Sequence, residues 1–508
     1  MNWIERRIKN QEPRTKSQEP RQKIIRKQII MQPINSQTKI IATLGPASAT
    51  KEIIHKMILE GVDVFRLNFS HSTQAEHLKL IHIIQDLNLE FETHVSILAD
   101  LQGPKLRVGE IENNLILLEK DDIITFVSEK CMGTKDHIYM SYQEFPRDVR
   151  VGEAMLIDDG KIKLEVTETN KKNMVKAKVI YGGPLSSNKG LNLPDTKVSL
   201  PGLSEEDISN AIFALKQDVD WIGLSFVRKP SDILDLKKII KDQKGRAGII
   251  AKIEKPEALL EIDRIIELAD GIMIARGDLG VEIPFDEVPL IQKSIVVKCI
   301  LQSKPVIIAT QMMESMITNF RPTRAEANDV ANAVLDGADA LMLSAETSVG
   351  NYPVETINSM QRIINYTENN TNRTNPFERM HIPDKKSSAF LADSICYNAS
   401  KLAEQVGAKA IILFTHSGYT AIKISSYRPK ARIYAFTNNK KLLQQLSLIW
   451  GVNPFHLSSY NQLNMAVTKS VEMLKAEELL ADGDCVVFVG STPLSEHGST
   501  NMLKVSFI

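Results

Sequence analysis

Cysteine is scarce in this chain: there are four residues among 508, and no two are close enough in the sequence to form a CxxC pair. Such spacing argues against a disulfide framework and against a cysteine zinc site. It suits a reducing compartment, so we expect a cytoplasmic protein.

Long apolar runs and an excess of one charge sign are missing as well. No apolar run approaches the roughly 20 residues that a membrane-spanning helix needs, and the N-terminus lacks the apolar core of a secretory signal. The 62 Lys and Arg residues balance 62 Asp and Glu residues. The composition implies no bulk attraction to membranes or nucleic acid, and we expect neither as a partner.

The balanced total conceals a basic N-terminus. Residues 1–30 contain nine Lys or Arg and three Glu, and the tetrapeptide QEPR occurs twice. We predict a basic, disordered extension over residues 1–37. Its glutamates argue against a transit peptide, and a translation start at Met31 explains the segment equally well.

A repeated pattern begins at Lys39: a short apolar run, a polar or glycine-rich end, then a stretch with helical spacing. Strands that alternate with helices predict a parallel sheet with right-handed crossovers. Eight such units predict a (β/α)₈ barrel, an α/β fold. The apolar runs span residues 39–44, 62–67, 95–99, 219–224, 248–253, 271–275, 305–309 and 338–343.

Two further domains are predicted around this barrel, which we assign to residues 38–104 and 199–368. Residues 105–198 have short alternating runs and turn signals typical of an all-β domain, inserted after the third strand. An Asn- and Thr-rich stretch near residue 370 resembles a linker. A C-terminal α/β domain is predicted to begin at this stretch and to span 369–508. Its strands are expected at 410–414, 432–436, 485–489 and 503–507.

Charged residues collect where the fifth and sixth strands end. Lys252 and Glu254 are two residues apart, so on a strand they lie on one face. Asp278 follows the next strand. The working face of a parallel barrel is the carboxyl end of its strands. Two carboxylates there suit Mg²⁺, which also takes phosphate oxygens of a substrate. An ion-pair cluster that closes the sheet is the alternative.

Polar residues also follow nearly all of the remaining predicted strands, and several of these residues are basic. A two-carboxylate site with Arg and Lys around it suits a phosphorylated, anionic substrate. The chain contains no Ser-His-Asp signature, no Walker A motif and no GxGxxG. His71 follows the second strand, but a lone histidine is more often structural, and we give it no catalytic role. Phosphoryl transfer needs positioning and charge neutralisation more than a nucleophilic side chain.

Several ordered motifs are similar to those of the pyruvate kinase family. They include TKIIATLGPAS (38–48), FRLNFSH (65–71), IAKIEKPE (250–257), MIARGDLGVEIP (273–284) and IIATQMMESM (307–316). The resemblance implies a barrel, a lid and a C-terminal regulatory domain in a homotetramer. It also implies transfer of the phosphoryl group of phosphoenolpyruvate to ADP, which gives ATP and pyruvate in glycolysis.

The resemblance also implies roles for individual residues. Glu254 and Asp278 correspond to the Mg²⁺ ligands, and Mn²⁺ is a possible substitute. Lys252 corresponds to the charge that stabilises the transferring phosphoryl group and the enolate. The other implied roles are a phosphate contact at Arg66, a carboxylate cradle at the Gly277 backbone and Thr310, and a proton route through Ser344 and Glu346.

Nucleotide and monovalent-cation sites are implied in the same way. Arg107 and Lys189 correspond to nucleotide-phosphate contacts from the lid, and Asn68 and His71 to nucleotide contacts from the barrel. The family's K⁺ is held by groups that match Asn68, Ser70, Asp100 and the Leu101 carbonyl. K⁺-dependent members have a glutamate where this chain has Lys105, so we hypothesise that the Lys105 ammonium replaces K⁺.

The C-terminal domain contains a hydroxyl-rich loop at residues 415–420, between a strand and a helix. Hydroxyls and backbone N–H groups at a helix start suit an anion. The family's sugar-phosphate effectors bind at the matching loop, so Thr415, Ser417 and Thr420 are candidate effector contacts. Tyr419 stands where a basic residue helps to hold a bisphosphate in other members. A simple helix cap is the alternative.

Two other functions stay open from the sequence. A Mg²⁺-dependent pyruvate-type aldolase or lyase would use the same barrel, carboxylate pair and enolate. The inserted domain with Arg107 and Lys189, which suits a second, nucleotide substrate, weakens that interpretation. An inactive sensor of phosphorylated metabolites is the third possibility, and the intact Lys252, Glu254, Asp278 and Thr310 argue against it.

Overall fold

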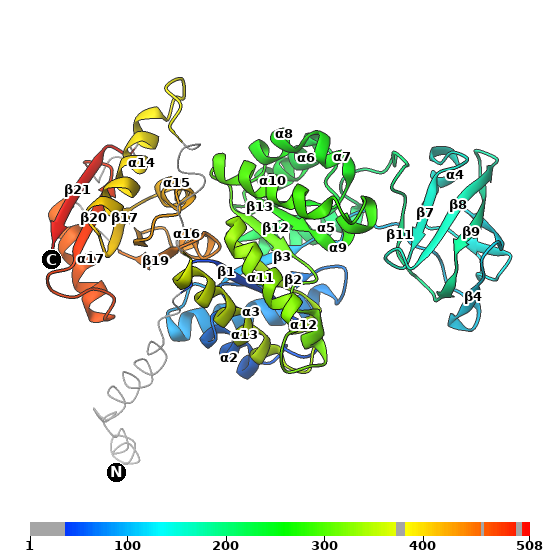
Figure 1. Ribbon diagram of the computed structural model, residues 1–508, viewed down its shortest axis with the longest axis horizontal. Helices are drawn as coiled ribbons and strands as arrows, with labels where there is room; N and C mark the ends of the chain where they lie inside the picture. Colours follow the sequence, from blue (N-terminus) through cyan, green and yellow to red (C-terminus); the bar gives the residue numbers. More distant parts are fainter. Residues whose placement is uncertain (1–35, 372–381, 459–461, 494–499) are drawn as a thin grey trace, which may run out of the picture.

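The computed structural model describes residues 36–371, 382–458, 462–493 and 500–508. Three bodies lie in a row, with the barrel between the C-terminal domain and the lid (Figure 1). The predicted extension over residues 1–37 lies almost wholly outside the described residues, as does part of the predicted linker. No described helix is long and apolar enough to cross a membrane.

The central body is a closed barrel of eight parallel strands in the order β1-β16-β15-β14-β13-β12-β3-β2, which confirms the predicted fold class. The apolar runs became strands because their side chains are buried both inside the barrel and under its helices. Their bounds are β1 Lys39–Thr43, β2 Val64–Asn68, β3 Ser96–Asp100, β12 Trp221–Leu224, β13 Gly248–Ile253, β14 Gly271–Ala275, β15 Val306–Ala309 and β16 Ala340–Leu343.

Helices cover the outside of the barrel. Ser204 and Thr323 start α5 and α11 with capping boxes. Glu261 (φ −111°, ψ 15°) separates α7 from α8. The helices are α2 Lys51–Leu59, α3 Gln74–Phe91, α5 Glu205–Lys216, α6 Pro230–Asp242, α7 Pro256–Leu260, α8 Ile262–Leu268, α9 Arg276–Glu282, α10 Val288–Leu301, η2 Glu314–Ile317, α11 Arg324–Asp336, α12 Ala345–Ser348 and α13 Pro353–Asn370.

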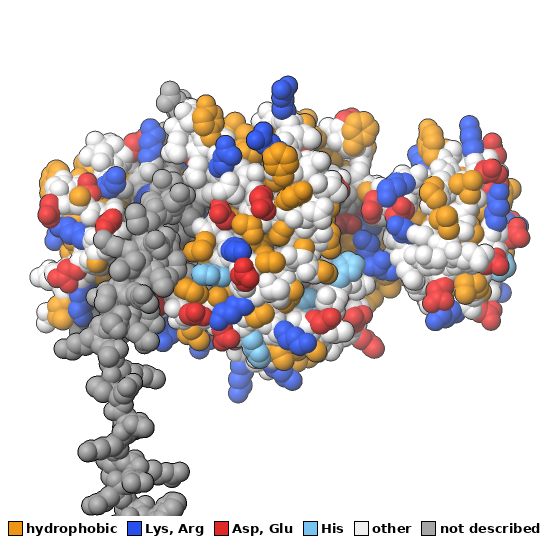
Figure 2. All heavy atoms as spheres, turned by 90° about the horizontal axis from the view of Figure 1, so that it is seen from below, with side chains coloured by type: hydrophobic (Ala, Val, Ile, Leu, Met, Phe, Trp, Pro, Cys, Tyr) orange, Lys and Arg blue, Asp and Glu red, His pale blue; other side chains and the backbone are white. Residues whose placement is uncertain are grey.

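The lid is a β domain with its own apolar core. It contains a six-stranded sheet in the order β11-β7-β8-β9-β5-β6 and a two-stranded sheet of β10 and β4. A recess separates it from the barrel (Figure 2). Its elements are η1 Glu112–Asn114, β4 Ile116–Leu118, β5 Ile123–Val127, β6 His137–Tyr139, α4 Phe145–Asp148, β7 Ala154–Ile157, β8 Ile162–Thr169, β9 Met174–Tyr181, β10 Gly183–Leu185 and β11 Leu191–Asn192.

The C-terminal domain has a five-stranded sheet in the order β19-β18-β17-β20-β21, in which only β21 is antiparallel to its neighbour. The sequence prediction missed β19, because Asn453 and Pro454 interrupt its apolar pattern. The elements are α14 Phe390–Gln405, β17 Ala410–Phe414, α15 Tyr419–Ser426, β18 Arg432–Thr437, α16 Lys440–Leu446, β19 Val452–His456, α17 Leu463–Ala476, β20 Cys485–Gly490 and β21 Met502–Phe507. All four cysteines of the chain are free.

An aspartate directly precedes four of the barrel strands and fixes their N-terminal ends. The carboxylates of Asp63, Asp220, Asp270 and Asp339 each accept a backbone N–H from a neighbouring strand, at 2.8–3.0 Å. Since a carboxylate accepts hydrogen bonds from backbone N–H groups strongly, this repeated contact holds adjacent strands in register at the end opposite the polar strand ends.

The C-terminal domain docks on this same end of the barrel. Lys441 on α16 pairs with Asp220 at 3.0 Å. Arg428 donates to both oxygens of Asp339, at 3.1 and 2.9 Å, and lies 4.9 Å from the Trp450 ring centroid. Leu448 packs with the apolar residues inside the barrel. Charge pairs and the apolar contact of Leu448 therefore join the two domains.

The Arg428–Asp339 pair is buried, with both side chains 5% exposed. Arg428→Ala would leave Asp339 as an unpaired buried charge, which costs about 3–5 kcal/mol. We expect this loss in urea unfolding followed by circular dichroism, in the transition that separates the C-terminal domain from the barrel. Lys430→Ala, which removes an exposed pair with Glu404, should cost less than about 1 kcal/mol. Equal effects of the two variants would contradict this.

Candidate active site

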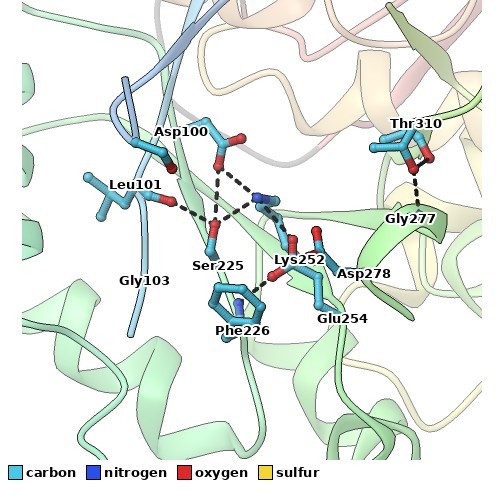
Figure 3. A network of polar contacts seen from close by, with 12 residues as sticks. Asp100, Leu101, Gly103, Ser225, Phe226, Lys252, Glu254, Gly277, Asp278 and Thr310 are labelled. Carbon is cyan, nitrogen blue, oxygen red and sulfur yellow. Dashed lines mark hydrogen bonds and ion pairs between the residues drawn. The ribbon is translucent and has the colours of Figure 1, made fainter. Parts of the chain in front are cut away.

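The polar residues that follow the barrel strands meet at one end of the barrel (Figure 3). Lys252 lies at the centre of this group. Its ammonium nitrogen is 3.1 Å from Asp100 Oδ1 and 3.0 Å from Glu254 Oε1. Lys252 is 8% exposed, and the two carboxylates are each 1% exposed. Charges buried this deeply need direct partners, and each of these three has at least one.

Arg66 adds a second cation to the same cluster. Its Nε donates to Asp100 Oδ2 at 2.7 Å, and one of its terminal nitrogens donates to Thr43 Oγ1 at 3.0 Å. Asp100 therefore lies between two positive groups, Arg66 from β2 and Lys252 from β13. The two basic side chains are fixed in place before any anion arrives.

The pKa values of this cluster follow from its charges. Burial alone would lower the pKa of Lys252, but the Asp100 and Glu254 carboxylates outweigh it and raise that pKa. Burial alone would raise the pKa of Asp100, but Lys252 and Arg66 outweigh it and lower that pKa. Lys252 stays protonated and Asp100 ionised over the ordinary range of pH.

Ser225 is a member of the cluster to which the sequence analysis gave no role, although it directly follows strand β12. Its hydroxyl donates to the Leu101 carbonyl at 2.6 Å, so its oxygen is free to accept from Lys252 Nζ at 2.7 Å. A hydroxyl has one proton. The bond to Leu101 therefore orients the Ser225 lone pairs toward the ammonium.

The second oxygen of Glu254 is held by the backbone. The Phe226 N–H donates to Glu254 Oε2 at 2.6 Å, and Phe226 has a φ of 53°. A positive φ is unfavourable for a bulky residue. Next to it, Gly103 has a φ of +72°, and a Cβ there would lie 2.8 Å from the Phe226 ring. The positive φ angles of Phe226 and Gly103 therefore accompany the hydrogen bond that holds Glu254.

The Glu254 and Asp278 carboxylates lie side by side beside Lys252 (Figure 3). Burial and the Asp278 charge raise the pKa of Glu254, which the Lys252 ammonium opposes. A divalent cation would relieve this repulsion, so the pair fits Mg²⁺. In the described part of the chain, no group of three or more His, Cys, Asp or Glu side chains is arranged as a metal site. Two protein carboxylates, with substrate and water oxygens, are typical of Mg²⁺.

Thr310 and Gly277 contact each other directly. The Gly277 N–H, in the first turn of α9, donates to Thr310 Oγ1 at 2.7 Å. Thr310 has a φ of 70°, and its carbonyl accepts from Arg276 at 2.8 Å. Arg276 also pairs with Asp329 at 2.8 Å. The unusual backbone of Thr310 places its hydroxyl against the start of α9.

Glu346 and Ser344 lie after β16. The Glu346 carboxylate accepts the Ser344 N–H at 2.7 Å and the Met313 N–H at 3.2 Å. Ser344 Oγ is buried and has no hydrogen-bond partner among the described residues. The predicted proton route thus has a fixed carboxylate next to an unused hydroxyl.

Three of the four groups of the predicted monovalent-cation site, Asn68, Asp100 and the Leu101 carbonyl, already accept hydrogen bonds. Asn68 Oδ1 accepts the Ser70 N–H at 3.1 Å, and Asp100 and the Leu101 carbonyl are bound as described above. The Lys105 ammonium pairs with Asp278 Oδ1, at 3.8 Å, among the ion pairs of the described residues. It approaches the predicted Mg²⁺ side of the cluster and forms no ion pair with Asp100.

Basic residues gather near His71, which is exposed. Burial of part of its ring, and then Arg107, Arg66 and Lys105, lower the pKa of His71. Arg107 donates to the Asn188 carbonyl at 3.0 Å. Lys189 pairs with Asp158 at 2.8 Å, within the lid. The Arg107 charge acts on His71 across the site, and Lys189 is paired within its own domain.

The hydroxyls of the predicted effector loop are used within the C-terminal domain. Thr415 Oγ1 accepts the Gly418 N–H at 3.0 Å, and Ser417 Oγ accepts the Tyr419 N–H at 3.5 Å. Thr420 shares a hydrogen bond with Thr500 at 2.7 Å. Tyr419 donates to Asp393. The N-cap residue of α15 is Gly418, and no side-chain hydrogen bond caps this helix.

Comparison with known proteins gives one consistent result. Residues 35–357 match the family model described as pyruvate kinase, barrel domain, and residues 393–506 match the one described as pyruvate kinase, alpha/beta domain.

Curated relatives and a solved structure carry the same name. A pyruvate kinase of Corynebacterium glutamicum is 40% identical, over 94% of this chain and 98% of its own. One of Geobacillus stearothermophilus is 40% identical, over 93% and 80%. The crystal structure of a pyruvate kinase from Cryptosporidium parvum has a TM-score of 0.88 at 34% identity, and the match covers 94% of this chain and 97% of that one.

The charge cluster gives a prediction about pH. The pKa of Asp100 is lowered in the folded state, so its stabilising effect is complete above its ordinary value of 3.8 and is lost as pH falls through the lower, folded value. Asp100→Asn should cost about 3 kcal/mol at pH 7, because it leaves the buried Arg66 without a carboxylate partner. We expect urea unfolding from pH 7 to pH 3 to show this difference in unfolding free energy between variant and wild type. The difference should stay constant down to about pH 4 and then shrink.

Asp136→Asn in the lid is the control, because Asp136 is exposed. Its unfolding free energy should stay within about 0.5 kcal/mol of wild type at every pH. A gap for Asp100→Asn that already closes between pH 7 and pH 5 would contradict the lowered pKa.

Proposed function

The chain belongs to the pyruvate kinase family, and we propose that it transfers the phosphoryl group of phosphoenolpyruvate to ADP at the carboxyl end of its barrel. In this reaction the bond between phosphorus and the enol oxygen breaks, and a bond from phosphorus to a β-phosphate oxygen of ADP forms. The enolate that remains takes a proton at its methylene carbon and becomes pyruvate. The products are pyruvate and ATP.

The observation that carries this proposal is the fixed Lys252 ammonium. It is held by Asp100, Glu254 and Ser225, and it lies beside the second carboxylate, Asp278. Phosphoryl transfer gains most from positive groups that are in place before charge moves. Lys252 and Arg66 meet this requirement, since their partners hold both side chains in fixed positions.

Each residue of the cluster has a proposed task. Glu254 and Asp278 would hold Mg²⁺, or Mn²⁺ in its place, which when bound neutralises charge on the phosphoryl oxygens. Arg66 binds phosphoryl oxygens. Lys252 donates to the phosphoryl group and then to the enolate oxygen. The Gly277 N–H and the Thr310 hydroxyl, which bind each other in this structure, turn to the substrate carboxylate when it binds.

Protonation of the enolate is assigned to the other side of the site. Thr310 lies near the carbon that must receive the proton in this proposal. Ser344, whose buried hydroxyl lacks a described partner, and Glu346, which is fixed by two backbone N–H groups, continue the route. A carboxylate beside an unused hydroxyl suits proton transfer through a short hydrogen-bonded chain.

ADP is proposed to bind in the recess between barrel and lid (Figure 2). Arg107 and Lys189 would contact its phosphates from the lid, and His71 and Asn68 would contact it from the barrel. Lys189 would leave its pair with Asp158 to reach a phosphate. The phosphate charge would then replace the Asp158 carboxylate as the partner of Lys189.

The oligomer and the regulation follow from the family alone. We infer a homotetramer that acts in the cytoplasm. Thr415, Ser417 and Thr420 are the proposed contacts of a phosphorylated effector, which would have to replace their present internal hydrogen bonds.

The direct test measures pyruvate formed from phosphoenolpyruvate with Mg²⁺, with and without ADP. Turnover that depends on ADP supports the proposal. Cleavage without a nucleotide would favour an aldolase or lyase, and binding without turnover would favour a sensor.

Replacing the central cation tests the mechanism. Lys252→Met keeps the length of the side chain and removes its charge. We expect kcat to fall by about 10³-fold or more, because the reaction loses a pre-positioned donor. Lys238→Met, on the exposed face of α6, is the matched control and should keep wild-type kcat. A loss below tenfold for Lys252→Met would exclude the proposed role.

The monovalent cation gives a second test. The resemblance is the ground on which we propose that the Lys105 ammonium makes K⁺ dispensable; in this structure that ammonium lies 3.8 Å from Asp278. Turnover should be the same in tetramethylammonium and in K⁺ buffers. Lys105→Glu should be weak without K⁺ and should recover when K⁺ is added. Wild-type activity that requires K⁺ would refute the proposal about Lys105 and leave the reaction assignment intact.

A further inference from the structure

A buried three-way contact connects the lid to the barrel close to the carboxylate pair. Glu282 Oε1 accepts from Lys255 Nζ at 2.5 Å and from Asn192 Nδ2 at 2.6 Å. Glu282 is 4% exposed and Asn192 is 7% exposed. Asn192 belongs to strand β11 of the lid, and the other two residues belong to the barrel.

The two barrel residues of this contact sit on the segments that carry the carboxylate pair. Lys255 directly follows Glu254 in the chain. Glu282 is four residues after Asp278 on α9, so both lie on one face of that helix. The ion pair between Lys255 and Glu282 therefore ties the segment of one carboxylate to the helix of the other.

The lid touches this same helix at other points. Gly160, in the turn between β7 and β8, lies close enough that a Cβ there would be 3.7 Å from Val281 Cγ1. Lys105, at the root of the lid, is 3.8 Å from Asp278. In Figure 1, β11 lies at the side of the lid that faces α9. Helix α9 is thus one barrel element on which the lid rests, beside Arg228, which donates to the Val198 carbonyl at 2.8 Å.

The uneven pairing of the two Glu282 oxygens makes the contact sensitive to the lid. Both donors use Oε1, and the buried Oε2 has no hydrogen-bond partner among the described residues. A buried carboxylate with one unsatisfied oxygen depends strongly on the donors it has. If Asn192 moved away with the lid, only Lys255 would be left to hold Glu282.

We propose that Glu282 is a positioning residue that makes divalent-ion binding depend on lid docking. With the lid docked, Asn192 and Lys255 together hold Glu282, and α9 keeps Asp278 beside Glu254. With the lid away, the hold on α9 weakens and the carboxylate pair is less well aligned for the ion. This inference rests on the proposed function, in which Glu254 and Asp278 are the ligands of the divalent ion.

The test measures Mn²⁺ binding to the full chain by electron paramagnetic resonance, without substrates. Asn192→Leu keeps the volume of the side chain and removes the donor. A hydrogen bond to a charged group is worth about a tenfold change in an equilibrium constant, so this variant should bind Mn²⁺ about tenfold more weakly. Asn173→Ala, at an exposed lid turn, is the control and should bind as wild type does.

A second pair of variants asks whether Asn192 acts through Glu282. Glu282→Gln keeps the shape and removes the charge, and a neutral acceptor forms a hydrogen bond about half as strong. Adding Asn192→Leu to Glu282→Gln should therefore weaken Mn²⁺ binding by about threefold or less. The same tenfold factor in both backgrounds would overturn the proposal, because Asn192 would then act by another route.

The outcomes separate this inference from the function on which it rests. Wild-type Mn²⁺ affinity in Asn192→Leu, in an enzyme that turns over phosphoenolpyruvate and ADP, overturns the lid coupling alone. No Mn²⁺ binding and no turnover in wild type overturns both. Circular dichroism and the melting temperature of each variant check that weaker binding does not come from a misfolded chain.

Discussion

The burial of one lysine ammonium is the constraint on which this site depends. A charge placed out of water must be compensated by groups in contact with it, and Lys252 obtains them from three strands: Asp100 ends β3, Ser225 follows β12 and Glu254 follows β13. Each compensating group then needs its own support. The Leu101 carbonyl, the strained Phe226 backbone and the glycine at 103 are parts of that support, and none of them would be needed around an apolar side chain.

The two ends of the barrel use charge for different purposes. At the carboxyl end, cations and anions are arranged so that a substrate can join them. At the opposite end, the aspartates that precede the strands bind backbone N–H groups. Two of them also pair with Arg428 and Lys441 of the C-terminal domain. A strand of four to six residues is the whole distance between the two ends. The docking of the C-terminal domain and the alignment of the strand ends are therefore parts of one rigid layer.

The periodicity of the sequence was sufficient to predict the barrel. Apolar runs gave the eight strands, and the spacing of two between Lys252 and Glu254 put them on one face. Contacts between distant segments were beyond its reach. Nothing local in Ser225 or in Glu282 marks it as a partner of a residue some 27 positions away, and the broken helix at Glu261 carries no proline or glycine signal. Strand β19 was missed for the opposite reason, because a local proline signal was overridden by pairing with β18.

Helix α9 is where the separate requirements of the site meet. Its first turn offers the Gly277 N–H and Asp278, its last turn offers Glu282, and the lid contacts it along its length. A helix of seven residues is too short to be stable on its own, so its position is set by what it touches. When those neighbouring segments move, the position of α9 changes with them. Because the lid is one of those neighbours, closure of the lid and the geometry of the carboxylate pair cannot be independent.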